Sequence, residues 1–196
     1  MSASSKPVAL VWLRMKSSLH GFTLIEFVVA LTVAGILLAI AVPAFKSFLQ
    51  NDRDAGQVNS LVMSLNYARS EAVKRASSNG ITFCPSVDGV NCDLAPGPWT
   101  EGWIVTFLDP VNGNQVLQSV PALNTVGGTN TLSTVTGPAT GITFSSSGLA
   151  SAALTLRVCD ARGAAFARQV EVNITGRVAA SQQPGKSVAG AALACP

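Results

Sequence analysis

One carboxylate near the N-terminus, that of Glu26, lies at the start of a long apolar stretch, where a charged side chain is unfavourable. The stretch His20-Gly21-Phe22-Thr23-Leu24-Ile25-Glu26-Phe27 leads into an apolar run that ends at Phe45. No charged residue occurs from Phe27 to Phe45, which is about the length that a helix needs to cross a bilayer. Glu26 therefore lies in the first turns of a predicted membrane helix. Because an unpaired charge in lipid costs at least ~2.5–3.5 kcal/mol, we expect Glu26 to have a partner or a function.

Enzyme chemistry finds little support in the residue types. His20 is the only histidine and lies ahead of the apolar run, so Ser-His and Cys-His nucleophile pairs are excluded from the rest of the chain. The acidic residues are scattered, and nothing resembles a phosphate-cradling loop. A Ser-Lys pair is the one arrangement that stays open, and no motif indicates it. We therefore expect a protein that is not an enzyme and that has no cofactor.

The cysteines indicate disulfides in an oxidising compartment. Four occur, all after the apolar run: Cys84, Cys92, Cys159 and Cys195. An even number beyond a membrane segment favours two disulfides. The residues from Cys84 to Cys92 read as a tight loop that a disulfide closes, with Asp88-Gly89 as its turn. Zinc is the alternative, but the chain has no C-x-x-C pair and no histidine after His20, so we expect no metal.

The length of the chain limits the number of domains, and its charge limits the kinds of partner. The 196 residues allow one globular domain and an anchor, and the formal charge is +3. Lys6, Arg14 and Lys16 precede the apolar run, and without them ten basic and ten acidic side chains remain. A basic footprint over the whole protein is therefore not predicted. The three leading positive charges predict a cytoplasmic N-terminus, with the rest of the chain across the membrane.

An ordinary secretory signal is the competing interpretation, because Ala39-Ile40-Ala41 offers a small-x-small cleavage site. The apolar run is long for such a signal and carries Glu26 near its start. We therefore divide the chain into a leader (1–21), a transmembrane helix (22–45), an amphipathic continuation of that helix (46–76) and a β-rich head (77–196).

The predicted helix has two weak points and two kinds of surface. Gly35 and Pro43 lie in the apolar half, where proline removes a backbone donor and kinks or loosens a helix. After Pro43, apolar residues recur at helical spacing and predict a docking seam for the head. They are Val58, Leu61, Val62, Leu65, Ala68, Ala72, Val73 and Ala76. The opposite face is predicted to hold Asn59, Asn66, Arg69 and Lys74.

Short strands between turn residues follow residue 77. The clearest hairpin joins 103–107 to 115–120 through a turn at 109–114. Further strands are predicted at 81–84, 141–144, 153–159, 167–174 and 177–179. Residues 124–140, rich in Thr, Gly and Asn, predict a surface loop. The tail from Ser181 to Pro196 is predicted to be loose unless Cys195 tethers it.

Two sets of motifs resemble a known family. Gly21-Phe22-Thr23-Leu24-Ile25-Glu26 ahead of an apolar run resembles the signal of type IV pilins and type II secretion pseudopilins. The resemblance implies that a prepilin peptidase cuts after Gly21 and that the new N-terminal Phe22 is methylated. Glu26 then becomes the fifth residue, and the implied role of this carboxylate is assembly. The positions of Gly35 and Pro43 also match the glycine and proline usual in that family.

The head resembles H-type minor subunits, the GspH/FimT group. The matching segments are 67–75 in the helix, Trp99-x-x-Gly102-Trp103 up to Asp109, Ile142-x-Phe144, Val158-Cys159-Asp160-x-Arg162-Gly163 and Thr175-Gly176-Arg177-Val178. The resemblance implies an α+β pilin fold, in which a long N-terminal helix packs on small antiparallel sheets. It also implies that Cys159 pairs with Cys195.

The function implied is a non-catalytic minor subunit of a type IV pilus or a type II secretion pseudopilus. Its implied partners are other pilins or pseudopilins, the prepilin peptidase and N-methyltransferase, and an inner-membrane assembly platform. The implied location is the bacterial inner membrane, with a single pass and a periplasmic head that enters a filament.

DNA binding during natural transformation is the alternative function. One branch of the family uses a Gly-Arg-x-Arg loop, but here Gly176-Arg177-Val178-Ala179 lacks the second arginine. The candidate DNA contacts are Arg157, Arg162, Arg168 and Arg177. No tyrosine or tryptophan lies near them for base stacking, so arginines on solvated strand faces are the favoured interpretation.

Overall fold

The computed structural model describes residues 21–76, 78–93, 99–123 and 130–195. The chain divides into two compact units, Met1–Phe45 and Lys46–Pro196, and each is described by itself. One helix, α1 (Leu24–Arg75), follows the described residues 21–23 in the first unit and continues into the second unit, with Pro43 inside the helix. The predicted leader, apart from Gly21, lies outside the described residues.

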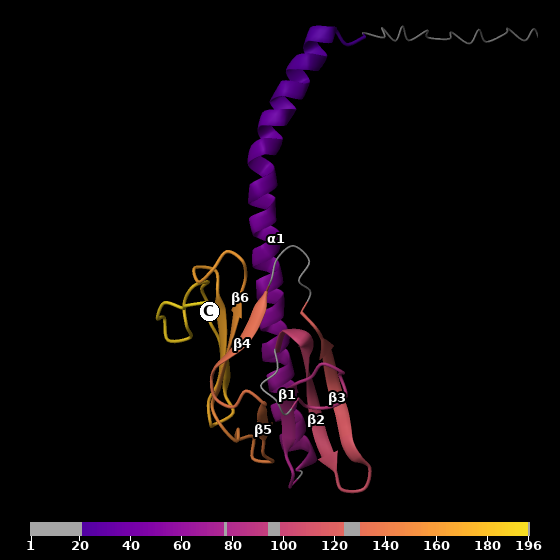
Figure 1. Cartoon of the computed structure of the whole chain (residues 1–196), viewed down its shortest axis with the longest axis vertical. Helices are drawn as coiled ribbons and strands as arrows, with labels where there is room; N and C mark the ends of the chain where they lie inside the picture. Colours follow the sequence, from indigo (N-terminus) through magenta and orange to yellow (C-terminus); the bar gives the residue numbers. More distant parts are fainter. Residues whose placement is uncertain (1–20, 77, 94–98, 124–129, 196) are drawn as a thin grey trace, which may run out of the picture. The chain divides into compact units, whose positions relative to one another are not determined.

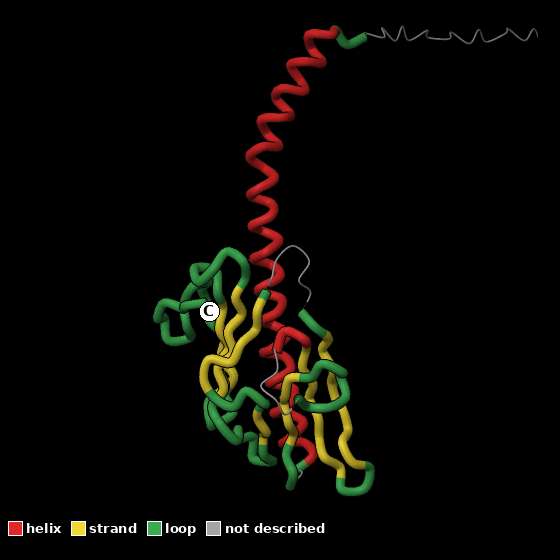
Figure 2. The backbone as a smooth tube through the Cα atoms, in the orientation of Figure 1, coloured by secondary structure: helices red, strands yellow, loops and turns green. Residues whose placement is uncertain are grey.

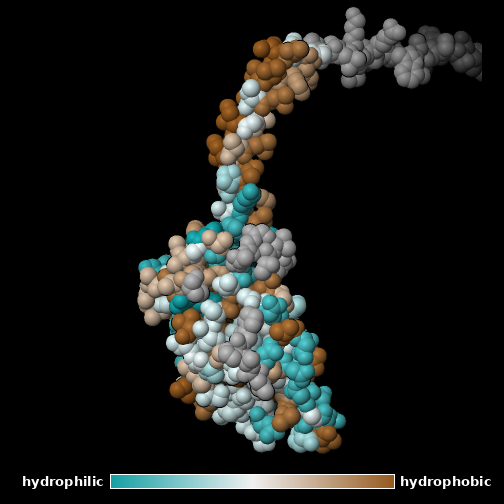
Figure 3. All heavy atoms as spheres, viewed as in Figure 1, coloured by the Kyte–Doolittle hydropathy of each residue, from teal (hydrophilic) through white to brown (hydrophobic). Residues whose placement is uncertain are grey.

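The start of α1 is fixed by Thr23. The Glu26 amide donates to the Thr23 hydroxyl oxygen at 3.3 Å, and the Phe27 amide donates to the Thr23 carbonyl at 3.1 Å. A threonine followed three residues later by glutamate is a common signature of a helix start, because the hydroxyl accepts from an amide that has no partner within the helix. Apolar side chains cover the part of α1 up to Phe45 (Figure 3), and this stretch is long and apolar enough to cross a membrane.

The second unit contains the rest of α1 and two four-stranded antiparallel sheets (Figure 1). The first sheet has the order β3-β2-β1-β5 and the second has the order β4-β6-β7-β8. The strands are β1 (Ile81–Pro85), β2 (Gly102–Asp109), β3 (Gly113–Pro121), β4 (Thr131–Thr136), β5 (Ile142–Phe144), β6 (Leu154–Cys159), β7 (Arg168–Val172) and β8 (Val178–Ala180). A short 3-10 helix, η1 (Trp99–Glu101), precedes β2.

A single hydrophobic core joins α1 to both sheets. Val58, Leu61, Leu65, Ala68 and Ala72 of the helix are buried, as the predicted seam requires. They pack with apolar residues from both sheets, among them Phe83, Trp103, Phe144, Leu156 and Val170. The helix therefore serves as the common support on which the two sheets are held.

The predicted seam is wrong at its C-terminal end, where the residues expected to be buried are exposed. Val73 and Ala76 are exposed, whereas the polar residues Ser64 and Glu71 are buried. Ser64 is buried because its hydroxyl accepts a hydrogen bond from the Trp103 indole at 3.0 Å. Glu71 pairs with Lys74 at 3.3 Å and Arg75 at 2.8 Å, and the hydrogen bond from Arg75 is the main cause that lowers its pKa. Specific hydrogen-bond and ion-pair partners thus stabilise the burial of Ser64 and Glu71, two polar residues that helical periodicity alone would not place on the buried face.

The β2–β3 hairpin and the other predicted strands are present within one or two residues of their predicted bounds, and β7 is shorter than predicted by one residue at its start and two at its end. The predicted loop at 124–140 is wrong in part, because β4 lies within it, while 124–129 fall outside the described residues. Only Leu132 of β4 is buried. A strand at a sheet edge with one buried side chain gives almost no hydrophobic alternation, so its β-branched threonines and Val135 were the available signal.

Both disulfides expected from the sequence are formed, Cys84–Cys92 and Cys159–Cys195. In the first loop, the Asp88 carboxylate accepts hydrogen bonds from the Val90 and Asn91 amides, each at 2.8 Å. These donors, together with the Asn91 and Ser86 side chains, hold the pKa of Asp88 far below its usual range. Asp88-Gly89 is therefore the turn of this loop, as predicted.

The C-terminal tail is ordered by its contacts with the second sheet (Figure 2). The Gly185 amide donates to the Ala167 carbonyl at 2.8 Å, and the Leu193 amide donates to the Gly185 carbonyl at 2.9 Å. Leu193, Cys159 and Ala167 form a small core of their own, against which Cys195 packs. The tail is thus held at its end by a disulfide and along its length by backbone hydrogen bonds.

Replacing Cys159 and Cys195 by serine should cost about 3–4 kcal/mol of unfolding free energy, because the bridge restricts a 36-residue separation in the unfolded chain. We expect limited proteolysis of the variant to cut first within 182–194, with the strands cut later. The Cys84/Cys92 double serine variant is the control, because it opens a loop with a separation of only 8 residues and leaves the tail protected.

Candidate assembly site

The proposed cleavage position lies outside the helix. Gly21 and Phe22 precede α1, and Phe22 is 84% exposed. Among the described residues beyond its chain neighbour, no atom lies within 4 Å of where a β-carbon on Gly21 would stand. A peptide bond free of helical hydrogen bonding, with a glycine before it and open space around it, is accessible to a peptidase.

Glu26 lies one helical turn after Phe22. Its amide is used by the Thr23 cap, while its carboxylate forms no ion pair within the described part of the chain. If the chain is cut after Gly21, Phe22 gains an ammonium at the same end of the helix. The site then presents one cation and one anion within a turn of each other on a membrane helix, and each needs a counter-charge when it leaves water.

A second polar site lies in the head, where Arg162 binds the start of the head portion of α1. Its guanidinium contacts Asp54 at 3.0 Å and Asp160 at 2.5 Å, and donates to the Asn51 side chain at 2.7 Å. The same group lies over the Phe166 ring, 4.1 Å from its centre. Arg162 therefore joins the loop after β6 to the helix through several charge-assisted bonds.

Asp54 is the buried member of this network. It is 3% exposed and also accepts from the Asn130 amide at 2.9 Å. Burial raises the pKa of Asp54, and the nearby Asp160 carboxylate raises it further, while Arg162 opposes both. The ionised form of Asp54 thus depends on Arg162.

We call the contact of Arg162 with Asp54 and Asp160 the clamp. The sequence did not predict it, although it contains one signal for it. Asp54 continues the series of buried positions 58, 61, 65, 68 and 72 at alternating spacings of four and three. A carboxylate at a seam position requires a buried partner. Which residue supplies that partner depends on how the β6–β7 loop folds back, and local patterns do not contain that information.

The four candidate DNA-binding arginines do not form one surface. Arg162 is used by the clamp, and Arg157 donates to the Ala194 carbonyl of the tail. Arg168 begins β7 and is half-buried, whereas Arg177 is exposed in the turn before β8. Of the four, Arg162 and Arg157 make their hydrogen bonds inside the head, where the Nε of Arg157 is buried without a partner among the described residues, and Arg168 and Arg177 are left for an external ligand.

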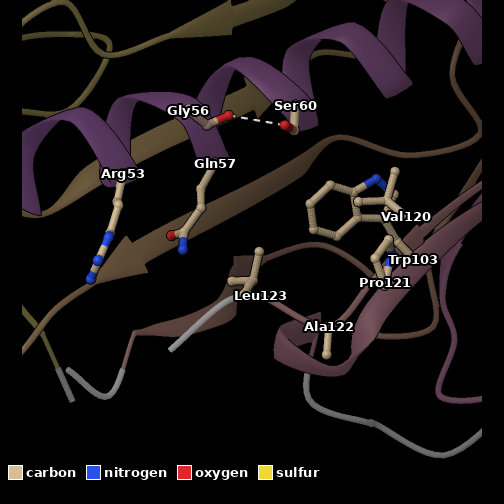
Figure 4. A pocket seen from close by; sticks show the side chains of 9 residues that line it. All are labelled: Arg53, Gly56, Gln57, Ser60, Trp103, Val120, Pro121, Ala122 and Leu123. Carbon is tan, nitrogen blue, oxygen red and sulfur yellow. Dashed lines mark hydrogen bonds between the residues drawn. The ribbon is translucent and has the colours of Figure 1, made fainter. Parts of the chain in front are cut away.

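A groove of about 300 Å³ lies between α1 and the end of β3 (Figure 4). Its lining includes Arg53, Gln57 and Ser60 of the helix, and Trp103 and Leu123 from the opposite side. The Ser60 hydroxyl donates to the Gly56 carbonyl at 3.0 Å, and the residues lining the groove place no acid or imidazole beside it. The groove offers hydrogen bonds and apolar contact, without a base that could activate the hydroxyl.

The fold and these features define the class of type IV pilins, with one N-terminal helix packed on antiparallel sheets and two disulfides. Residues 57–176 match the model of the type II transport protein GspH, and residues 17–42 match the prokaryotic N-terminal methylation motif. Since the first match covers more than half of the chain, the protein belongs to the GspH family. A comparison with curated protein sequences gives no match.

The comparison with solved structures found similar chains, among them a minor pilin and a minor pseudopilin. The type IV minor pilin FimU of Pseudomonas aeruginosa is 19% identical, with a TM-score of 0.51, over 68% of this chain and 98% of that chain. The minor pseudopilin EpsH from the type 2 secretion system of Vibrio cholerae is 16% identical, with a TM-score of 0.47, over 66% of this chain and 96% of that chain.

Proposed function

We propose that the protein is a minor, non-catalytic subunit needed to assemble a type IV pilus or a type II secretion pseudopilus. The observation that carries the proposal is the methylation motif at residues 17–42, directly ahead of an apolar helix and a GspH-type head. The subunit sits in the bacterial inner membrane through residues 22–45, with its N-terminus in the cytoplasm and its head in the periplasm.

Processing creates the assembly site. A prepilin peptidase cuts between Gly21 and Phe22 and methylates the new N-terminus. An assembly platform then brings subunits together, and the Glu26 carboxylate of the incoming subunit pairs with the Phe22 ammonium of its neighbour. Glu26 thereby fixes the axial register of the subunit, because pairing the two charges offsets part of the cost of removing each from water.

The Gly21→Val variant tests the processing step. We expect it to stay uncut, because the added side chain blocks the close backbone approach that glycine permits. Mass spectrometry of the N-terminal peptide should find Phe22 in the parent protein and the intact leader in the variant. A mature chain that begins at Val42 would instead identify an ordinary signal peptide and would overturn the proposal.

DNA binding is the competing function, and the exposed Arg177 is the observation in its favour. If it is correct, a gel-shift assay with the head should show binding that weakens with salt and is lost in Arg177→Ala. Binding that is absent from the parent head at low salt would leave only the structural role. The pilus and the secretion pseudopilus are distinguished by the neighbouring genes, which encode pilus-tip subunits in one case and a secretin with secretion components in the other.

A further inference from the structure

Strand β8 lies at the end of the second sheet, so one of its two edges has no partner strand. On its inner edge the Ser181 amide donates to the Gln169 carbonyl at 2.8 Å, which fixes the alternation of the β7–β8 ladder. Counted back from that bond, Ala179 is hydrogen-bonded to β7, whereas Val178 and Ala180 occupy the alternate positions. The backbone amides and carbonyls of Val178 and Ala180 therefore point toward the open edge.

This edge is unused within the described part of the chain. No hydrogen bond joins a described residue to the outward groups of β8. The tail beside β8 forms a small hairpin of its own, in which Lys186 bridges Ala192 and the Ser187 amide donates to the Ala191 carbonyl at 2.8 Å. A hollow of about 400 Å³ is lined by β8 and this part of the tail. Its volume lies within the ~300–1,000 Å³ usual for ligand sites.

The hollow is positively charged. Arg177 and Lys186 line it together with two glutamines of the tail, and both cationic side chains are exposed. Neither cation lies in an ion pair within the described part of the head, and no acidic residue lines the hollow. The nearest carboxylate along the ladder is that of Glu171, opposite Ala179 on β7, and it accepts a hydrogen bond from the Gln169 side chain. The open edge of β8 thus adjoins two cations that have no counter-charge.

We propose that the edge of β8 binds an extended, acidic segment of a different subunit of the same filament. The segment adds to the second sheet as an antiparallel strand. Its residues opposite Val178 and Ala180 exchange up to four backbone hydrogen bonds with the edge. The residue between them lies opposite Ala179, on the face of the sheet that Arg177 shares, because side chains two apart in a strand point the same way. Complementarity with the two cations requires Asp or Glu at that central position.

The lining of the hollow favours a peptide over a nucleic acid. The edge offers carbonyl acceptors as well as amide donors, and a phosphate can use only the donors. No aromatic residue lines the hollow, so a base has no ring on which to stack. On its inner edge β8 already pairs with Val170-Glu171-Val172, in which the glutamate lies opposite Ala179. A segment of similar sequence therefore suits the outer edge.

This inference rests on the proposed function, which supplies different subunits as neighbours, and it adds the kind of segment that one of them contributes. Binding of a defined peptide to the mature full-length chain in detergent micelles tests it. The probe is acetylated and amidated Thr-Val-Glu-Val-Thr, whose β-branched residues favour an extended conformation. Amide hydrogen exchange followed by NMR resolves each residue of β8. Saturating peptide should slow exchange at the Val178 and Ala180 amides at least about tenfold, because both gain a hydrogen bond. The Ala179 amide, already bonded to β7, should not change.

Two changes remove the edge contact and leave the ladder to β7 intact. Ala180→Pro deletes one outward amide, and proline is tolerated on an edge strand where its nitrogen faces solvent. A peptide methylated at both valine nitrogens loses the matching donors and leaves the protein unaltered. Calorimetric titration should show that each change weakens binding at least about tenfold.

The charge is tested by a peptide with glutamine in place of the central glutamate. This peptide should bind the parent chain about fivefold more weakly, as loss of exposed ion pairs predicts. The Arg177→Gln/Lys186→Gln chain should bind both peptides equally. Lys74→Gln removes an exposed cation of α1 and is the matched control, which should keep the preference for glutamate.

Four results would overturn the inference. They are the absence of peptide binding, binding without slower exchange at Val178 and Ala180, equal affinity of the parent chain for the two peptides, and slower exchange at the same amides when the protein is concentrated alone. The last result would assign the edge to a second copy of the chain. Displacement of the peptide by a thymidine oligonucleotide would assign the hollow to nucleic acid and would also overturn it. None of these results bears on cleavage after Gly21 or on Glu26, so the proposed function is decided separately.

Discussion

The Glu26→Ala chain should be cut after Gly21 and remain in the membrane, yet be missing from purified filaments. Breaking a buried ion pair by removing one partner costs about 3–5 kcal/mol, so recovery in filaments should fall by more than about 100-fold. Processing should be unaffected, because the Thr23 cap uses the amide of residue 26 and not its carboxylate. Immunoblots of membrane and filament fractions measure the partition, and mass spectrometry checks the N-terminus.

Two matched variants separate the charge from the shape. Glu26→Gln keeps the length and polarity of the side chain but removes the charge, and it should fail nearly as completely as alanine. Glu101→Gln removes an exposed carboxylate of the head and should enter filaments far better than either Glu26 variant, since a screened surface charge contributes little. Recovery of Glu26→Ala at the level of the parent protein would show that this carboxylate has no role in register.

Strong, local patterns allowed most of the fold to be predicted. Helix α1 begins and ends within two residues of its predicted bounds, because the apolar run and the following seam both have helical spacing. The hairpin around Asp109 to Asn114 is recognisable because turn residues separate two apolar segments. The Cys84–Cys92 loop follows from its short spacing and its Asp-Gly turn.

Features that depend on distant partners could not be predicted in the same way. Ser64 is buried by an indole 39 residues away, and Asp54 by a guanidinium 108 residues away. Neither partner is indicated by local spacing, because only the packing of both sheets on α1 brings them together. The strand β4 was missed for a related reason, since an edge strand with little burial has a weak hydrophobic pattern.

The Arg162→Ala substitution should strongly destabilise the head. It leaves Asp54, which is 3% exposed, and its neighbour Asp160 without their shared cation. Uncompensated buried charge costs about 3–5 kcal/mol, which for a unit of this size lowers the Tm by about 10 °C. All buried apolar residues lie between Val58 and Leu193 among those described, so a fragment from Lys46 onward should fold and can be used for thermal and urea unfolding.

The pH dependence of that loss identifies its cause. Without Arg162, the pKa of Asp54 should rise further, because burial and Asp160 then act unopposed. A carboxyl whose folded-state pKa exceeds its unfolded value ionises first in the unfolded chain, so its contribution to stability falls as the pH rises above about 4. The deficit of Arg162→Ala should therefore be largest near pH 7 and should shrink as the pH falls toward 4.

Two comparisons make this prediction decisive. Arg177→Ala removes an exposed arginine of the same sheet and should change the unfolding free energy by less than about 0.5 kcal/mol. Asp54→Asn combined with Arg162→Ala removes the buried anion together with its cation, so it should recover part of the loss and flatten the pH dependence. A deficit of equal size at pH 4 and pH 7 would mean that Arg162 acts through packing on Phe166 and not through charge.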